Sequence, residues 1–162
     1  MVIAPDNFRD EEFQEPKKVL ESAGHKITVA NSTGTESKGM LGAIVKPNIR
    51  LDQANSDDYD AIIFVGGTGA SVYFNDSRAL NLAKEFNEKG KIVAAICIAP
   101  SILVNAGILN GKKATSYPSE RNNINSVGTY TGSQVEKDGN IITGYGPNAA
   151  KEFGEKILEA LG

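Results

Sequence analysis

Residues Val93 to Ser101 read VAAICIAPS, an apolar run that leads into a cysteine and then a proline. The apolar residues before Cys97 predict a buried strand. Pro100 suits the first turn of a helix, where its missing N–H group costs nothing. Cys97 is therefore expected on a sharp turn between a strand and a helix. The small residues Ala95 and Ala99 have the spacing that a nucleophile elbow requires, because larger side chains would collide there.

A turn of this kind favours a reactive thiol. The N-terminus of the following helix carries partial positive charge and free N–H groups, which should lower the pKa of Cys97, and the backbone is expected to be strained. The alternative is a buried structural cysteine, since cysteine is among the most buried residue types. Cys97 is the only cysteine, so the chain forms no intrachain disulfide and a reducing compartment, the cytoplasm, is expected.

Strand and helix patterns alternate on both sides of this turn. Strands are expected at 1–5, 26–30, 59–65, 91–96, 113–116, 128–130, 134–136 and 141–143, and helices at 8–24, 76–89, 100–106 and 148–161. Residues 43–45 and 49–51 are expected to pair as a hairpin. The alternation predicts a single α/β domain over residues 1–162, with a mainly parallel sheet and helices on both faces. The short first strand is consistent with a truncated or late start.

In such a sheet, ligands bind beyond the carboxyl ends of the strands. Four segments satisfy this condition: 6–12, 66–69, Cys97 itself and 117–118. The second is a glycine turn that begins with Gly66 and Gly67, where backbone N–H groups can approach a ligand closely. It lacks the spacing of a dinucleotide fingerprint and no Walker lysine follows. It is either a simple tight turn or half of an oxyanion hole, with a second N–H group after Cys97.

Composition narrows the possible partners. The net charge of −3 and the absence of a Lys/Arg run do not indicate a nucleic-acid binder. The longest apolar stretch, 92–104, is interrupted by Pro100 and is too short to span a bilayer. The N-terminus does not look like a signal peptide. No cofactor is expected, and no metal, because one histidine and one cysteine on different sheet edges do not form the usual cluster.

The chain resembles the ThiJ/PfpI superfamily, which includes peptidase-like proteins, glyoxalase III enzymes, deglycases and redox-linked chaperones. The matching segments run in the family's order through 8–16, 22–25, 59–67, 94–100, 106–116, 135–143 and 146–147. The resemblance implies a flavodoxin-like three-layer α/β sandwich. It also implies a homo-oligomer, either a dimer or a larger assembly.

The family's site residues carry over by position. Cys97 matches the nucleophile, Glu12 matches the glutamate that hydrogen-bonds the cysteine, and Gly67 and Ile98 match the backbone donors of the oxyanion site. The resemblance implies a protonated Glu12 beside a thiolate, which is reasonable because a desolvated carboxyl next to an anion has a raised pKa. Without the resemblance, Glu11, Glu12 and Glu15 could not be separated. Gly66 and Tyr117 are further candidates for the pocket.

The sequence departs from the family where a peptidase needs an imidazole. Ile98 and Tyr117 stand where different branches of the family have histidine, and Tyr145 replaces a frequent arginine. Tyr117 is more simply explained as a packed tyrosine than as a hydrogen-bond donor to substrate. The only histidine, His25, is expected on the surface at the amino edge of the sheet, away from Cys97. Peptide cleavage is therefore disfavoured, because proton transfer to a leaving amine usually uses histidine.

Two hypotheses need only a thiol and a carboxyl group. The first is an enzyme acting on small reactive carbonyls such as methylglyoxal, with Cys97 as nucleophile and Glu12 as acid and base. The second is a non-enzymatic redox sensor or chaperone, in which an oxidant converts Cys97 to a sulfinate that Glu12 stabilises. A cysteine peptidase or amidase remains the third and least supported hypothesis.

Overall fold

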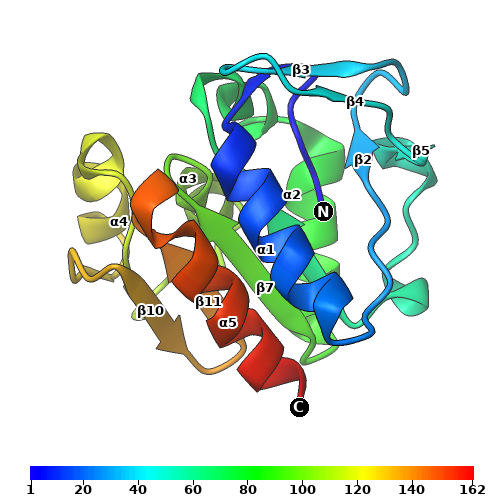
Figure 1. The fold of residues 1–162 in the computed structure, drawn as a ribbon. Coiled ribbons are helices and arrows are strands. Elements are labelled where there is room, and N and C mark those ends of the chain that lie inside the picture. The colour runs from blue at the N-terminus through cyan, green and yellow to red at the C-terminus, as the bar shows by residue number, and fades with distance from the viewer.

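A twisted, mostly parallel sheet forms the middle layer of the computed structural model, which describes residues 1–162 (Figure 1). Its strands, in spatial order, are β10 (Val135–Asp138), β11 (Ile141–Gly144), β7 (Ile92–Ile96), β6 (Ala61–Phe64), β2 (Ala30–Asn31) and β5 (Ile49–Arg50), with Val2 bridging β6 and β2. Only β10 runs antiparallel to its neighbour. The carboxyl ends of β6 and β7 therefore meet at one edge.

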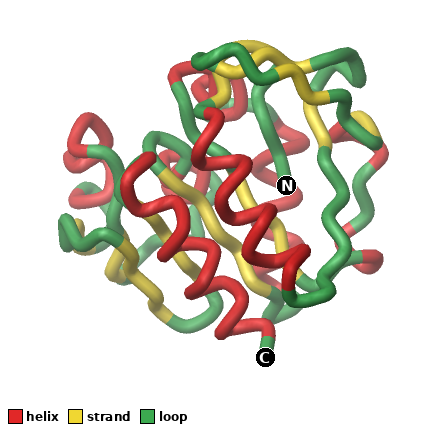
Figure 2. Tube along the Cα trace, in the orientation of Figure 1, coloured by secondary structure: helices red, strands yellow, loops and turns green.

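Helices cover both faces of this sheet. In Figure 1, α1 (Asp10–Ser22) and α5 (Ala150–Leu161) lie side by side in front of it, and α2 (Ser77–Glu88) and α3 (Pro100–Asn105) lie behind. A short helix, α4 (Arg121–Asn125), follows on the left. Figure 2 shows the same helix–sheet–helix layering, which confirms the expected three-layer sandwich. None of the helices has both the length and the apolarity needed to cross a bilayer.

The two faces follow from the alternation of side chains along the central strands. On β7, Val93 and Ala95 join the larger apolar core under α2 and α3, whereas Ala94 and Ile96 join the core under α1 and α5. Because successive side chains of a strand point to opposite faces, a continuous apolar run is what a strand covered on both sides requires. The run before Cys97 was interpreted correctly on this ground.

Pairing of the short strands differs from the expected hairpin between residues 43–45 and 49–51. Instead, β4 (Ile44–Val45) pairs antiparallel with β3 (Ser37–Gly39), and β5 pairs parallel with β2. Asn48 explains the separation, because its backbone N–H donates to Val29 O while its side chain accepts from Val29 N, at 2.8 and 2.7 Å. These bonds anchor the chain after β4 to Val29, so that β5 pairs with β2 in the main sheet. The strand expected at 26–30 is regular only at β2.

The remaining short strands lie outside the central sheet. β1 (Asp6–Phe8) pairs in parallel with β3, and β8 (Lys113–Ala114) pairs in parallel with β9 (Thr129–Tyr130). The opening strand of the main sheet is only residues around Val2, so β1 is a separate element that leads directly into α1. This arrangement brings the start of α1 to the carboxyl edge of the sheet.

Asp10 fastens the turn between β3 and β4 to the start of α1. Asp10 is 5% exposed, and its carboxylate accepts from the backbone N–H groups of Leu41 and Ala43 at 3.0 and 2.9 Å. A carboxylate that accepts two backbone N–H groups makes strong, charge-assisted hydrogen bonds. Met40, at the start of this turn, lines the pocket described next.

Candidate active site

Cys97 lies on the expected turn between β7 and α3. Its φ of 66° places a non-glycine residue in the left-handed region, which costs on the order of 1 kcal/mol. Two hydrogen bonds hold this conformation: Cys97 N donates to Gly144 O at 3.0 Å, and Tyr117 N donates to Cys97 O at 2.9 Å. Neighbouring segments thus fix the strained residue from both sides. Ala99, like Ala95, is fully buried, so the turn has no room for larger side chains.

Glu12 lies beneath the sulfur of Cys97. It comes from the first turn of α1 and is fully buried. Its carboxyl group faces the Cys97 thiol and the Gly66 N–H, yet neither oxygen makes a hydrogen bond of ordinary distance and angle. Both contacts are therefore loose and electrostatic. A buried carboxyl with two unpartnered oxygens is costly, and such groups are typical of functional sites.

Gly66 makes this approach of Glu12 and Cys97 possible. A Cβ built on Gly66 would overlap Glu12 Oε1 and would lie 2.5 Å from the Cβ of Cys97 and 2.6 Å from the carbonyl oxygen of Ile96. Glycine is therefore required here for close packing and not for an unusual φ. Gly66 was expected to line the pocket, but it is not among the lining residues. It packs against Glu12 and Cys97 instead.

Backbone N–H groups surround the sulfur from the other side. Those of Gly67 and Ile98 face the thiol and act to lower the pKa of Cys97. Gly67 has a φ of 97°, and a Cβ there would collide with the backbone of Asn7 and Arg9, so the glycine turn packs directly on β1. The structure thus brings together Cys97, Glu12, Gly67 and Ile98, which the resemblance had selected.

The protonation state of Cys97, which interacts with Glu12, differs from the one that the sequence suggested. Burial raises the pKa of Glu12 to about 8, although the Cys97 thiol and Arg9 oppose the shift. Burial also raises the pKa of Cys97 to about 12, and the negative charge of Glu12 adds to this effect. The helix that should lower the thiol pKa, α3, has only six residues. At neutral pH Glu12 is therefore protonated as expected, but the predicted lowering of the Cys97 pKa is outweighed by burial.

A pocket of about 290 Å³ opens onto Cys97. Nine residues line it: Arg9, Met40, Gly67, Thr68, Cys97, Ile98, Tyr117, Ser119 and Pro147. The expected residues Gly67, Ile98 and Tyr117 are among them. Sequence reasoning missed Arg9, Met40, Thr68, Ser119 and Pro147. Of these, Arg9 and Thr68 fall in the segments that follow strands and could have been selected, whereas nothing local marks Met40.

Tyr117 and His25 lie at opposite ends of the sheet strands. Tyr117 is 46% exposed and its ring lies 6.2 Å from that of Tyr145, so it borders the pocket and is not a packed core tyrosine. His25 is half-buried, less exposed than expected, and lines a separate cavity with Lys26, Asp58 and Asp60. Asp60 directly precedes β6, so this cavity lies at the amino end of the strands, as predicted for His25.

Comparisons with known proteins agree with this architecture. The family model described as DJ-1/PfpI family matches residues 1–160. An uncharacterized protein of Methanocaldococcus jannaschii is 44% identical over 99% of this chain and 80% of its own length. A protein of Pyrococcus abyssi named a deglycase is 31% identical over 88% of this chain and 87% of its own. The solved ThiJ/PfpI domain protein of Brachyspira murdochii superposes with a TM-score of 0.96 at 32% identity, covering 99% of this chain and 93% of that one.

A three-layer sandwich with a cysteine on the turn after its central strand defines the broad class. Within that class, the chain belongs to the DJ-1/PfpI family.

Proposed function

We propose that this protein converts small 2-oxoaldehydes, or adducts derived from them, with Cys97 as nucleophile and Glu12 as proton carrier. The observation that carries the proposal is the buried, unpartnered carboxyl of Glu12 against the sulfur of Cys97, at the base of an open pocket. The name deglycase of the Pyrococcus abyssi relative supports the same class of chemistry. Neither group needs a metal or an imidazole for the steps below.

The first step forms a carbon–sulfur bond. The sulfur attacks the aldehyde carbon, the thiol proton passes to the Glu12 carboxylate, and the carbonyl electron pair moves onto oxygen. The former aldehyde oxygen now carries a negative charge. We expect the N–H groups of Gly67 and Ile98, which face the sulfur, to stabilise that charge. Glu12 then returns its proton to that oxygen and yields a hemithioacetal.

The second stage moves hydrogen between the two carbonyl carbons. Glu12 removes the proton from the carbon bound to sulfur and a proton is delivered to the neighbouring carbonyl oxygen, which gives an enediol and then a 2-hydroxyacyl thioester. Water cleaves the thioester and releases the 2-hydroxy acid and the free thiol. The balance is one oxoaldehyde plus one water to one hydroxy acid, so methylglyoxal gives lactate.

The test is lactate formation from methylglyoxal by the purified protein. We expect Cys97→Ala to reduce it to the uncatalysed rate and Glu12→Gln to lower kcat by about 10²- to 10⁴-fold, the usual contribution of a general acid–base. Glu15→Gln, on the same helix, is the matched control. No lactate from the wild type, or an unchanged rate in Cys97→Ala, would refute the proposal.

The pH dependence gives an independent check. Because the pKa of Glu12 is raised to about 8, the carboxylate that accepts the thiol proton becomes available as the pH rises towards that value. We expect kcat/KM to increase from pH 6 to about pH 8 and then to level off. A profile that is flat through this interval would contradict the role assigned to Glu12.

Oxidation of Cys97 is a second candidate function, favoured by the same unpartnered carboxyl. Glu12 is protonated at neutral pH and can donate a hydrogen bond to an oxygen of the sulfinate. The N–H groups of Gly67 and Ile98 can donate to the sulfinate as well. Two peroxide molecules convert the thiol to the sulfinic acid and leave two waters. A Cys97 peptide that gains two oxygen atoms at dilute peroxide, in the wild type but not in Glu12→Gln, would support this function. An unmodified Cys97 would exclude it.

A further inference from the structure

Arg9 supplies the only cationic side chain that lines the Cys97 pocket. It directly precedes α1 and follows β1, so backbone geometry fixes its origin at the pocket wall. Its backbone N–H donates to Gly66 O at 3.0 Å, which ties it to the glycine turn. The positive charge of Arg9 is close enough to Glu12 to act to lower the pKa of that carboxyl group.

The guanidinium of Arg9 is only partly engaged. Its Nε donates to Glu11 Oε2 at 2.8 Å, and neither Nη group has an acceptor within the protein. The side chains of Arg9 and Glu11 are 30% and 32% exposed. An ion pair at such exposure contributes only about 0–1 kcal/mol, so it does not prevent Arg9 from binding a second anion. The two free Nη groups form one edge of the planar guanidinium, and their N–H bonds match the two oxygens of a carboxylate.

The hydroxyl of Ser119, which also lines the pocket, does not donate to an anion. Ser119 Oγ donates its proton to Glu120 Oε2 at 2.6 Å, while Ser101 Oγ donates to the other oxygen of Glu120 at 2.8 Å. The Ser119 hydroxyl therefore presents only acceptor lone pairs to the pocket. Thr68, beside Gly67, has a hydroxyl with no partner in the protein and remains able to donate.

From this asymmetry we propose that Arg9 selects substrates with an anionic tail, so that the aldehyde end reacts at Cys97 while a carboxylate or phosphate binds the guanidinium. The substrate class depends on the proposed function, but the preference of the pocket for an anion does not. It can be measured at the sulfur itself without any turnover. Such a measurement separates failure of this inference from failure of the enzymatic proposal.

The experiment compares alkylation of Cys97 by iodoacetate and iodoacetamide at pH 7. In both reactions a sulfur–carbon bond forms, the carbon–iodine bond breaks, iodide leaves and the thiol proton goes to solvent. The reagents have nearly the same size and differ in one negative charge. Because both need the thiolate, the ratio of their rate constants cancels the ionised fraction of Cys97. The ratio for N-acetylcysteine serves as the reference.

We expect the wild-type ratio to exceed the reference by about three- to tenfold, the scale of a partly exposed charge-assisted contact. Arg9→Gln should return it to the reference, and Arg9→Lys should keep part of it. Glu11→Gln, which removes the competing carboxylate, should raise it. Opposite changes in the Arg9 and Glu11 variants cannot both arise from a damaged fold.

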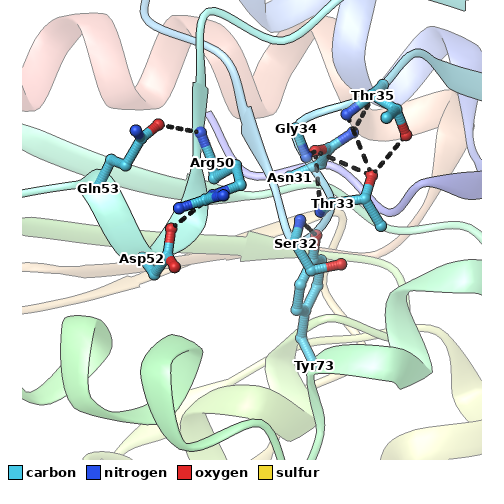
Figure 3. Close-up of polar contacts among 9 residues, drawn as sticks. All are labelled: Asn31, Ser32, Thr33, Gly34, Thr35, Arg50, Asp52, Gln53 and Tyr73. Atoms are coloured by element: carbon cyan, nitrogen blue, oxygen red, sulfur yellow. Dashed lines mark hydrogen bonds and ion pairs between the residues drawn. The ribbon is translucent and has the colours of Figure 1, made fainter.

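Arg50 provides a matched control. Like Arg9, it pairs through Nε with an acid two residues later, Asp52, at 3.1 Å. Figure 3 shows this pair near the Asn31–Thr35 loop, whose Ser32 N–H donates to the Tyr73 hydroxyl. Arg50→Gln removes the same charge without touching the pocket and should leave the ratio unchanged. An equal change in Arg9→Gln and Arg50→Gln, or no change in Arg9→Gln, would overturn the proposal.

A final arm distinguishes the two kinds of anion. Acetate and inorganic phosphate are each tested for protection of Cys97 against iodoacetamide, in the wild type and in Arg9→Gln. Protection by acetate alone assigns the tail as a carboxylate, and protection by phosphate alone assigns it as a phosphate. Protection that persists unchanged in Arg9→Gln counts against the inference.

Discussion

Replacing Glu12 with glutamine is expected to stabilise the protein at pH 9 by on the order of 4 kcal/mol and to change its stability little at pH 4. The reason is burial, which raises the pKa of Glu12 from 4.5 to about 8 in the folded protein. Below pH 4.5 the group is protonated in both the folded and the unfolded states. As the pH rises to about 8, the unfolded chain ionises freely whereas the folded protein must either hold the proton or bury a charge.

The wild-type free energy of unfolding should therefore fall between about pH 4.5 and pH 8, and the slope should largely disappear in Glu12→Gln. Urea unfolding at a series of pH values up to 9 measures this directly. Glu15→Gln is the control, because Glu15 lies three residues further along α1 and is only half-buried. A wild-type slope that survives in Glu12→Gln would show that Glu12 does not carry the effect.

Substituting Gly66 with alanine is expected to cost about 3 kcal/mol of stability, or more, and to abolish the pairing of Glu12 with Cys97. The added methyl group would overlap Glu12 Oε1 and would approach the Cβ of Cys97 to 2.5 Å. Neither neighbour can move away easily, because Cys97 is held by two backbone hydrogen bonds and Glu12 is enclosed.

Gly90→Ala separates this packing effect from the backbone preference of glycine. Gly90 has a φ of 68° and nothing within 4 Å of an added Cβ, so its substitution should cost only about 1 kcal/mol. Chemical unfolding of both variants, together with iodoacetamide labelling of Cys97, provides the comparison. Equal losses of stability, with unchanged labelling in Gly66→Ala, would contradict the close packing inferred at Gly66.

Local sequence was informative wherever neighbouring residues decide the structure. The buried run before Cys97 and the helix beginning at Pro100 depend on residues within one short segment, and both were predicted correctly. The wrong hairpin shows the limit of that reasoning. The partners of β4 and β5 are set by β3 and β2, which local alternation does not identify.

The strand-to-helix turn at Cys97 was readable from local sequence, because an apolar run, small residues on either side and Pro100 all favour it. Apart from the family resemblance, the sequence did not separate Glu12 from Glu11 and Glu15, since all three are acidic residues near the start of one helix. The fold supplies the physical reason for choosing Glu12, because α1 packs against the glycine turn so that Glu12 alone of the three is fully enclosed. The same enclosure raises the pKa values of Glu12 and Cys97, because burial penalises the charged form of each.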